Sequence, residues 1–268
     1  MIEKKIHYCW FGDKPLPEDA KRYIESWKKY CPDYEIKEWN EQNFDLDKYP
    51  YVREAYDNKK FAFVTDVVRL YACYNEGGIY MDTDVEVLKN LDRFLTHEGV
   101  SGFESIIYVP TGMMGCQKGF PLFKELLDEY DGLHFVKPDG SFDMTTNVIR
   151  ITNTCLKYGL VPNGKFQIVN GFALYPSDYF CPKSWKDGKI YLTENSYTIH
   201  HFAASWVSDK DKRDNKVRQK IVSVFGENRF SNFVFNMYNY YAVICDSIKE
   251  KGCLYVIKKG IKTLSDKL

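Results

Sequence analysis

The chain has 268 residues, of which 44% are hydrophobic and 28% are charged. A chain of this length can bury one large core, so we expect one main domain with an extension. Lys plus Arg and Asp plus Glu number 37 each, which gives a formal net charge of zero. The chain therefore lacks the bulk positive charge typical of nucleic-acid-binding proteins, and nucleic acid is not an expected partner.

The eight cysteines are scattered along the chain without a Cys-x-x-Cys pair, and several lie inside apolar patterns. This distribution indicates buried thiols of a reducing compartment and argues against zinc ligands or a disulfide framework. The chain opens with no signal-peptide pattern, and no apolar run reaches the ~18 residues of a membrane span. We therefore expect a cytoplasmic protein.

The first forty residues predict a β-α-β unit, which is the opening of a nucleotide-binding half. Residues 4–12 alternate like a strand that stops at a glycine, residues 15–30 predict a helix, and residues 34–39 form a second alternating run. Trp10 lies at the carboxyl end of the first strand, where open α/β sheets bind their ligands. Its ring either stacks on a nucleobase or packs under the following helix, and periodicity does not separate these alternatives.

Residues 61–76 predict a helix that ends at Gly77. Asp66 and Arg69 stand three residues apart on this helix and therefore share a face. One interpretation is an ion pair on the protein surface, worth a few tenths of a kcal/mol. The other is a pair that binds the hydroxyls and phosphate of a ligand.

A short apolar strand through residues 79–81 carries two carboxylates at its end, Asp82 and Asp84. Two Asp side chains this close repel each other unless a cation or a network of sugar hydroxyls lies between them. Mg²⁺ or Mn²⁺ is the natural occupant. Because Asp-x-Asp also occurs in many solvated turns, the surrounding residues decide its meaning.

Four blocks of sequence carry a family resemblance, at residues 6–12, 65–69, 77–84 and 200–206. In their order and spacing, the chain resembles the bacterial capsular-polysaccharide and mannosyl-type glycosyltransferases of family thirty-two. More distantly, it is similar to the glucosyltransferase domains of the large clostridial toxins. Together the four blocks are far more specific than Asp-x-Asp alone.

The resemblance implies an α/β fold of the GT-A type, Rossmann-like and nucleotide-sugar-binding, with additional C-terminal helices. It implies a metal-dependent, retaining hexosyltransferase that uses Mn²⁺ or Mg²⁺. The donor would be a nucleotide sugar, UDP-linked by this resemblance, and the acceptor a glycan or a lipid-linked oligosaccharide. The reaction would belong to capsule or other surface polysaccharide synthesis.

The resemblance also assigns roles to single residues. Trp10 would stack on the uracil ring, and Asp66 and Arg69 would contact the donor sugar and its phosphate. Asp84 would bind the metal directly, whereas Asp82 would contact the ribose or sugar and reach the metal through water.

Two adjacent histidines, His200 and His201, follow a β-like run that includes residues 190–192 and 197–199. Neighbouring residues of a strand point to opposite faces, so only one would reach the metal. By analogy with other metal-dependent retaining glycosyltransferases, we expect His201 to be the third ligand; the alternative is a hydrogen-bonded core histidine. The resemblance places Ser205 and Trp206 over the diphosphate. Further candidate site residues are His7, His200 and Asn147.

Asn147 either hydrogen-bonds a sugar or follows two threonines that begin a helix. We expect residues 1–210 to form the GT-A catalytic domain and residues 211–268 a helical extension packed on it. The lysine-rich end of this extension predicts a basic amphipathic helix, which either rests on an anionic membrane or packs as an ordinary surface helix. The competing functional classes are a non-catalytic carbohydrate or divalent-cation binding module and an enzyme that mainly hydrolyses its donor.

Overall fold

The structure is a computed structural model that describes residues 1–110, 112–203 and 209–251. Ser205, Trp206 and the lysine-rich segment from residue 252 onward lie outside the described residues. The chain divides into two compact units, Met1–Lys183 with Ile190–Trp206, and Ser184–Lys189 with Val207–Leu268. Their roles as catalytic domain and packed extension stay a prediction.

The first unit is built on a seven-stranded sheet with the order β2-β1-β3-β6-β5-β8-β7. Strand β1 is parallel to β2 and β3, and β5 is parallel to β8, whereas β6 is antiparallel to both β3 and β5. Strands β1, β3, β5 and β8 therefore end at the same edge of the sheet, which we call the carboxyl edge. The strands are β1 Lys5–Cys9, β2 Glu35–Trp39, β3 Gly78–Met81, β5 Gly99–Gly102, β6 Met113–Cys116, β7 Gln167–Val169 and β8 Phe172–Tyr175.

A second, two-stranded sheet joins distant parts of the same unit. Strand β4, Val85–Val87, pairs antiparallel with β9, Thr198–His200. In this register Val85 lies opposite His200. The pairing therefore brings the histidine segment to the residues that follow Asp82 and Asp84.

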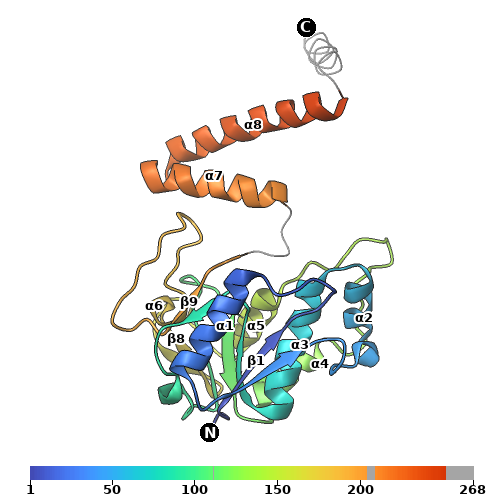
Figure 1. The fold of residues 1–268 in the computed structure, drawn as a ribbon, viewed down its shortest axis with the longest axis vertical. Helices are drawn as coiled ribbons and strands as arrows, with labels where there is room; N and C mark the ends of the chain where they lie inside the picture. The colour runs from blue at the N-terminus through green and yellow to red at the C-terminus, as the bar shows by residue number, and fades with distance from the viewer. Residues whose placement is uncertain (111, 204–208, 252–268) are drawn as a thin grey trace. The chain divides into compact units, whose positions relative to one another are not determined.

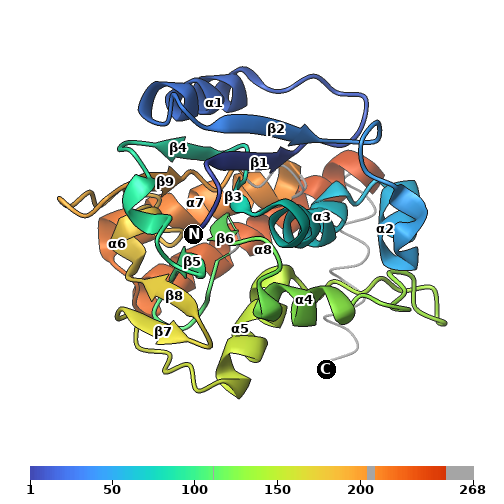
Figure 2. The same cartoon turned by 90° about the horizontal axis from the view of Figure 1, so that it is seen from below.

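Helices cover both faces of the large sheet, and Figure 2 shows α1 and α3 on opposite sides of β1. The side chains of β3 alternate between two cores: Tyr80 packs on the side of α3, and Ile79 and Met81 on the side of α1. The helices of this unit are α1 Glu18–Tyr30, α2 Pro50–Asp57, α3 Phe61–Glu76, α4 Pro121–Asp128, α5 Asn147–Lys157 and α6 Ser177–Phe180, with 3₁₀ turns η1 Leu46–Lys48 and η2 Asp92–Phe94.

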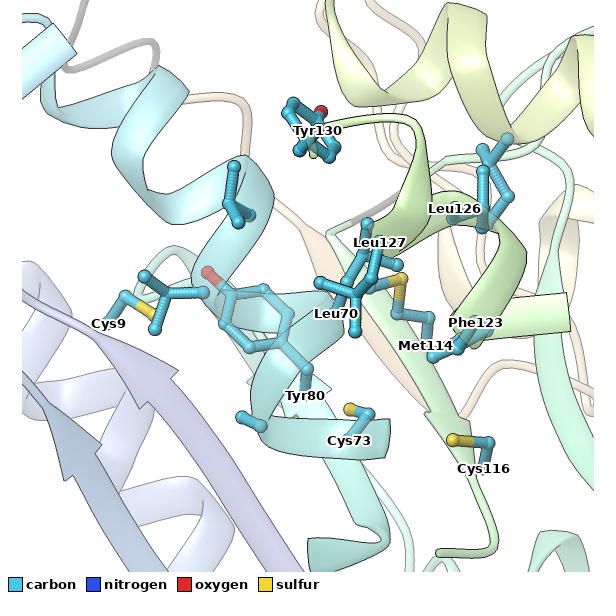
Figure 3. Close-up of a cluster of buried hydrophobic side chains, with 14 of the residues drawn as sticks. Cys9, Leu70, Cys73, Tyr80, Met114, Cys116, Phe123, Leu126, Leu127 and Tyr130 are labelled. Carbon is cyan, nitrogen blue, oxygen red and sulfur yellow. The ribbon is translucent and has the colours of Figure 1, made fainter. Parts of the chain in front are cut away.

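Helix α3 is buried on nearly all sides, as expected for a helix that is apolar around most of its circumference. Figure 3 shows its Leu70 and Cys73 close to Tyr80 and to side chains of β6 and α4. The helix ends at Gly77, whose φ of 70° is open to glycine but costly for other residues. Because α3 is enclosed, its two charged residues in the middle are enclosed with it.

The second unit contains a pair of helices, α7 Asp209–Phe225 and α8 Arg229–Lys251 (Figure 1). Asn228 and Ser231 exchange hydrogen bonds between backbone N–H groups and side-chain oxygens at the start of α8. The Tyr238 hydroxyl donates to Asp214 across the pair, at 2.9 Å. Within the described residues, no helix has the length and apolar character needed to traverse a bilayer. Peripheral membrane contact stays a prediction.

The predicted α/β fold class with additional C-terminal helices is confirmed. Its assignment to the Rossmann-like GT-A type stays a prediction. One local expectation differs from the structure. Residues 190–192 form no strand, and only Ile190 makes an isolated bridge, to Lys183.

Candidate functional site

The two carboxylates of the Asp-x-Asp motif lie in a tight turn at the carboxyl edge. Strand β3 ends at Met81, and the Val85 N–H donates to the Asp82 carbonyl at 2.9 Å, which closes the turn. The Asp82 N–H donates to the carbonyl of Gly112, just before β6, at 2.8 Å. The motif is therefore held by its own turn and by the neighbouring strand.

His200 completes a group of candidate metal ligands. Asp82, Asp84 and His200 each offer one ligand atom, and these atoms lie within 4.8 Å of one another. The Nε2 atom of His200 is 3.3 Å from Asp84 Oδ1. Burial alone would raise the pKa of Asp84, but His200 and the N–H of Ala203 lower it to about 2. Burial would lower the pKa of His200, but Asp84 raises it well above its usual value.

The other histidine points away from this group. The His201 Nε2 atom lies 2.8 Å from Glu86, and its ring stacks on Tyr23 of α1 with centroids 4.5 Å apart. Only its backbone reaches the motif, since its N–H donates to the Asp84 carbonyl at 2.9 Å. The structure therefore brings His200 to the motif and not His201, because β4–β9 pairing puts His200 beside the motif and strand alternation turns His201 toward α1. This placement argues against the expected choice of His201, and the ligand set itself stays a prediction.

Arg69 connects helix α3 to the motif from inside the protein. Its Nη2 atom lies 3.3 Å from Asp66 Oδ1 and 3.3 Å from Asp82 Oδ1, and its guanidinium lies over the ring of Tyr80. The Tyr80 hydroxyl donates to the same Asp82 oxygen, at 2.8 Å. Asp66 and Arg69 are 8% and 5% exposed, which excludes the surface ion pair considered from the sequence.

Asn147 is joined to the same cluster. Its backbone N–H donates to Asp66 Oδ2 and its side-chain amide to the Asp66 carbonyl, both at 3.0 Å. Thr146, at the N-cap of α5, makes no side-chain capping bond, so Asp66 caps this helix instead. Burial raises the pKa of Asp66 to about 6, although Arg69 and the Asn147 N–H act in the opposite direction. The Oδ1 atom of Asn147 is buried and has no hydrogen-bond partner among the described residues.

The two N-terminal candidates differ. Trp10 follows β1 at the carboxyl edge, is partly buried, and donates from Nε1 to the Lys14 carbonyl at 2.6 Å. Its nucleobase-stacking role stays a prediction. His7 is fully buried: its Nε2 lies 2.7 Å from the Gly77 carbonyl, and Trp39 donates to its Nδ1 at 3.1 Å. Both ring nitrogens are used inside the core, so we withdraw His7 as a site residue.

Two charged residues near the motif were not identified from the sequence. Lys183 donates from Nζ to the His201 carbonyl at 2.6 Å; burial lowers its pKa, whereas Asp84 acts in the opposite direction. Glu104 stands two residues beyond β5, at the carboxyl edge. In the sequence, Glu104 follows Gly99–Gly102, a run of four residues with a glycine at each end. Such a run is a weak strand pattern, so this part of the sequence offers little indication that Glu104 lies at a sheet edge.

A comparison of the sequence with known families identifies the matched region. Residues 17–101 match the model of a family described as "Glycosyltransferase sugar-binding region containing DXD motif". The predicted resemblance to DXD-containing glycosyltransferases is thereby confirmed. The enzymatic activity of the whole chain stays a prediction. The segment contains Asp66, Arg69, Asp82 and Asp84, whereas His200 lies beyond it. The more distant likeness to toxin domains stays a prediction.

Among curated proteins, inositol phosphoceramide mannosyltransferase 3 of Schizosaccharomyces pombe is 30% identical over 130 residues, which cover 47% of this chain and 36% of that protein. Inositol phosphoceramide mannosyltransferase 2 of the same organism is 26% identical, over 77% of this chain and 58% of that protein. The uncharacterized glycosyltransferase L373 of Acanthamoeba polyphaga mimivirus is 25% identical, over 87% of this chain and 92% of that protein. The alignments thus span 36% and 58% of the two yeast relatives.

Proposed function

We propose that this protein is a metal-dependent glycosyltransferase that moves a hexose from a nucleotide sugar to a glycan or lipid-linked acceptor. The observation that carries the proposal is the convergence of Asp82, Asp84 and His200 within 4.8 Å at the carboxyl edge. Arg69 links this group to the buried Asp66. The match to a DXD-containing sugar-binding region supports the same conclusion.

The chemistry of the three side chains fits a divalent ion. Two carboxylates this close need positive charge between them, and an imidazole adds a nitrogen ligand. This donor set favours Mn²⁺ over Mg²⁺, since Mg²⁺ prefers oxygen ligands alone. Asp82, Asp84 and His200 would hold the ion. When bound, it neutralises the charge that develops on the departing diphosphate.

The remaining residues position the donor. Arg69 and Lys183 would bring positive charge toward the diphosphate, and Asp66 would accept a hydrogen bond from a sugar hydroxyl. The buried Asn147 Oδ1 atom is a further acceptor for such a hydroxyl, because it has no partner among the residues that the structure describes. Trp10 would stack on the nucleobase.

We infer a retaining reaction from the family resemblance. The acceptor hydroxyl attacks the anomeric carbon from the side of the leaving diphosphate, and its proton passes to a diphosphate oxygen as the old bond breaks. Anomeric analysis of the product by NMR tests this, and an inverted linkage would refute it.

The names of the yeast relatives direct the choice of donor and acceptor. Both are named for mannosyl transfer to inositol phosphoceramide. We therefore place GDP-mannose beside the UDP-sugars as candidate donors and inositol-phosphate glycolipids beside oligosaccharides as candidate acceptors. A place in capsule synthesis stays a prediction.

The testing experiment measures free nucleotide released from UDP-glucose, UDP-galactose, UDP-N-acetylglucosamine and GDP-mannose. Each donor is assayed with Mn²⁺, with Mg²⁺ and with a chelator, in the presence and absence of acceptors. We expect turnover of one donor with Mn²⁺ and its loss on chelation. Donors that give no release are followed by binding calorimetry.

The outcomes separate the competing classes. Nucleotide release without a new glycoside on any acceptor would indicate a donor hydrolase. Binding of Mn²⁺ without binding of any nucleotide sugar would favour the structural-cation module.

A further inference from the structure

Glu104 occupies a fixed position at the carboxyl edge. Strands β3 and β5 are both antiparallel to β6, so they run in the same direction and end at the same edge. The Phe103 N–H donates to the Tyr175 carbonyl and the Glu104 N–H to the Tyr108 carbonyl, both at 2.9 Å. Glu104 therefore follows β5 much as Asp82 follows β3, on backbone that the sheet holds in place.

The Glu104 side chain is partly buried, and its carboxylate has no hydrogen-bond or ion-pair partner among the described residues. The buried Asp66 and Asp143 instead accept from a backbone N–H, and each has an arginine partner. A carboxylate withdrawn from water is stabilised by hydrogen-bond donors, so its isolation indicates that a ligand supplies them.

The charged groups around Glu104 limit the chemical class of ligand that its carboxylate can bind. Burial raises the pKa of Glu104, His200 lowers it and Asp82 raises it, so the carboxylate lies within the field of the metal-ligand group. It is not among the three residues whose ligand atoms converge. A second anion, such as the diphosphate, would be repelled. Neutral hydroxyls are the donors that suit an acceptor-only carboxylate at this place.

We propose that Glu104 is a sugar-binding residue, whose carboxylate accepts hydrogen bonds from hydroxyls of a sugar held beside Asp82, Asp84 and His200. This inference rests on the proposed glycosyltransferase function and adds a specificity-determining residue to it. The hydroxyls belong either to the transferred hexose or to the acceptor sugar, which share this chemistry. The two sources differ in which binding step Glu104 supports.

The test compares Glu104→Gln with Glu98→Gln. Glu98 is exposed and precedes the same strand β5 at the opposite edge, so it is a matched control. Calorimetry measures binding of Mn²⁺, of UDP and GDP, and of UDP-glucose, UDP-galactose and GDP-mannose in the presence of Mn²⁺. Steady-state assays with acceptor then separate KM for donor, KM for acceptor and kcat. Thermal unfolding checks that each variant folds.

If Glu104 contacts the transferred hexose, Glu104→Gln binds Mn²⁺ and nucleoside diphosphate like the wild type but binds the nucleotide sugar ~10-fold more weakly. If it contacts the acceptor sugar, nucleotide-sugar binding is unchanged and the acceptor KM rises ~10-fold. Glu104→Asp, which keeps the charge on a shorter side chain, should lose less in the same step. Glu98→Gln should change none of these constants.

Two outcomes would overturn the inference about Glu104 and leave the proposed glycosyltransferase function standing. One is a wild type that binds a nucleotide sugar while Glu104→Gln matches Glu98→Gln in every constant. The other is an equal loss of nucleoside diphosphate and nucleotide-sugar binding, which would place Glu104 with the diphosphate or the fold. If Glu104→Gln does not fold, Glu104→Asp decides by the same criteria. A wild type that binds no nucleotide sugar would overturn the proposed function, and this inference with it.

Discussion

The surroundings of two histidines in the first unit differ in one respect. His7 lies where β1 meets the end of α3, and the Gly77 carbonyl and the Trp39 indole use both of its ring nitrogens. His200 lies at the carboxyl edge, where Nε2 faces Asp84 within a group of three convergent ligand atoms. Residue type does not separate the two, and both are withdrawn from water to a large extent: His7 is fully buried and His200 is half-buried.

The two histidines differ in whether other groups of the protein already occupy the hydrogen-bonding positions of the ring nitrogens. A buried histidine with donor and acceptor both satisfied stabilises the fold and has nothing left to offer a ligand. Around His200, two carboxylates and one imidazole bring ligand atoms within 4.8 Å of one another, and the buried Nδ1 atom of His200 has no hydrogen-bond partner among the described residues. The comparison therefore predicts that substitutions at the carboxyl edge change metal binding and catalysis. Substitutions of His7, where β1 meets the end of α3, should instead change the stability of the fold.

The largest effect is expected for Asp84→Asn. The amide cannot supply the charge that Asp84 offers a divalent ion, so we expect Mn²⁺-dependent turnover to fall about 100- to 1000-fold. Asp131→Asn, at an exposed carboxylate, is the control and should leave turnover unchanged. The measurement is nucleotide release at saturating donor and Mn²⁺. Equal activity in the two variants would contradict the assignment of Asp84.

The histidine pair gives the next largest effect. His200→Gln should weaken Mn²⁺ binding ~10- to 100-fold, on the scale seen when the coordination of metal sites is disturbed. His201→Gln should change it less than ~3-fold, a small fraction of that scale, because His201 pairs with Glu86 and Tyr23. Calorimetric titration with Mn²⁺ measures both. The reverse order of the two variants would restore the choice made from the sequence.

Gly112→Ala should perturb the same group indirectly. A Cβ at this position would lie 2.8 Å from His200 Nδ1, so the imidazole must move. Overpacking of this kind costs about 1–3 kcal/mol, and we expect up to ~10-fold weaker Mn²⁺ binding. A double-mutant cycle with His200→Gln is decisive, because the glycine should lose its influence on Mn²⁺ once the histidine is gone. Full additivity would show that the two residues act separately.

The smallest effect on metal binding is expected at His7. Burial lowers the folded-state pKa of His7 from 6.5 to about 4. A depressed folded-state pKa stabilises the protein fully above pH 6.5, and this contribution is lost as the pH falls toward 4, by at most ~1.4 kcal/mol per pH unit.

His7→Gln keeps one donor and one acceptor but does not titrate. Urea unfolding at pH 7.5 and pH 4.5 should show a smaller loss of stability in this variant than in the wild type, with Mn²⁺ binding at pH 7.5 unchanged. An identical pH dependence in the two proteins would count against a neutral, core-bound His7.

The long, locally patterned parts of the fold were predictable. The helix at residues 61–76 and the strand that carries the Asp-x-Asp motif appear where the periodicity and the glycine pair place them. Strands β5 and β6 were not recognised, because four residues that include glycine carry too little periodic signal. Without β5, Glu104 had no assigned place at the carboxyl edge.

The choice between the histidines depended on long-range pairing. Alternation on a strand showed that only one histidine would face the motif, but which one depends on the β4–β9 register. That register joins residues more than one hundred positions apart, and no local pattern encodes it. The burial of Asp66 and Arg69 was easier to predict from the sequence, because α3 is apolar around most of its circumference.

The backbone hydrogen bonds that join the Asp-x-Asp turn to Gly112 and His201 have a consequence for biosynthesis. The turn bonds forward to Gly112, and His201 returns to it after a separation of more than one hundred residues. A nascent chain that has emerged only as far as the end of the matched sugar-binding region at residue 101 carries both aspartates but not the histidine. A metal site built from Asp82, Asp84 and His200 would therefore be complete only after the ribosome has delivered most of the chain and the β4–β9 pairing has formed.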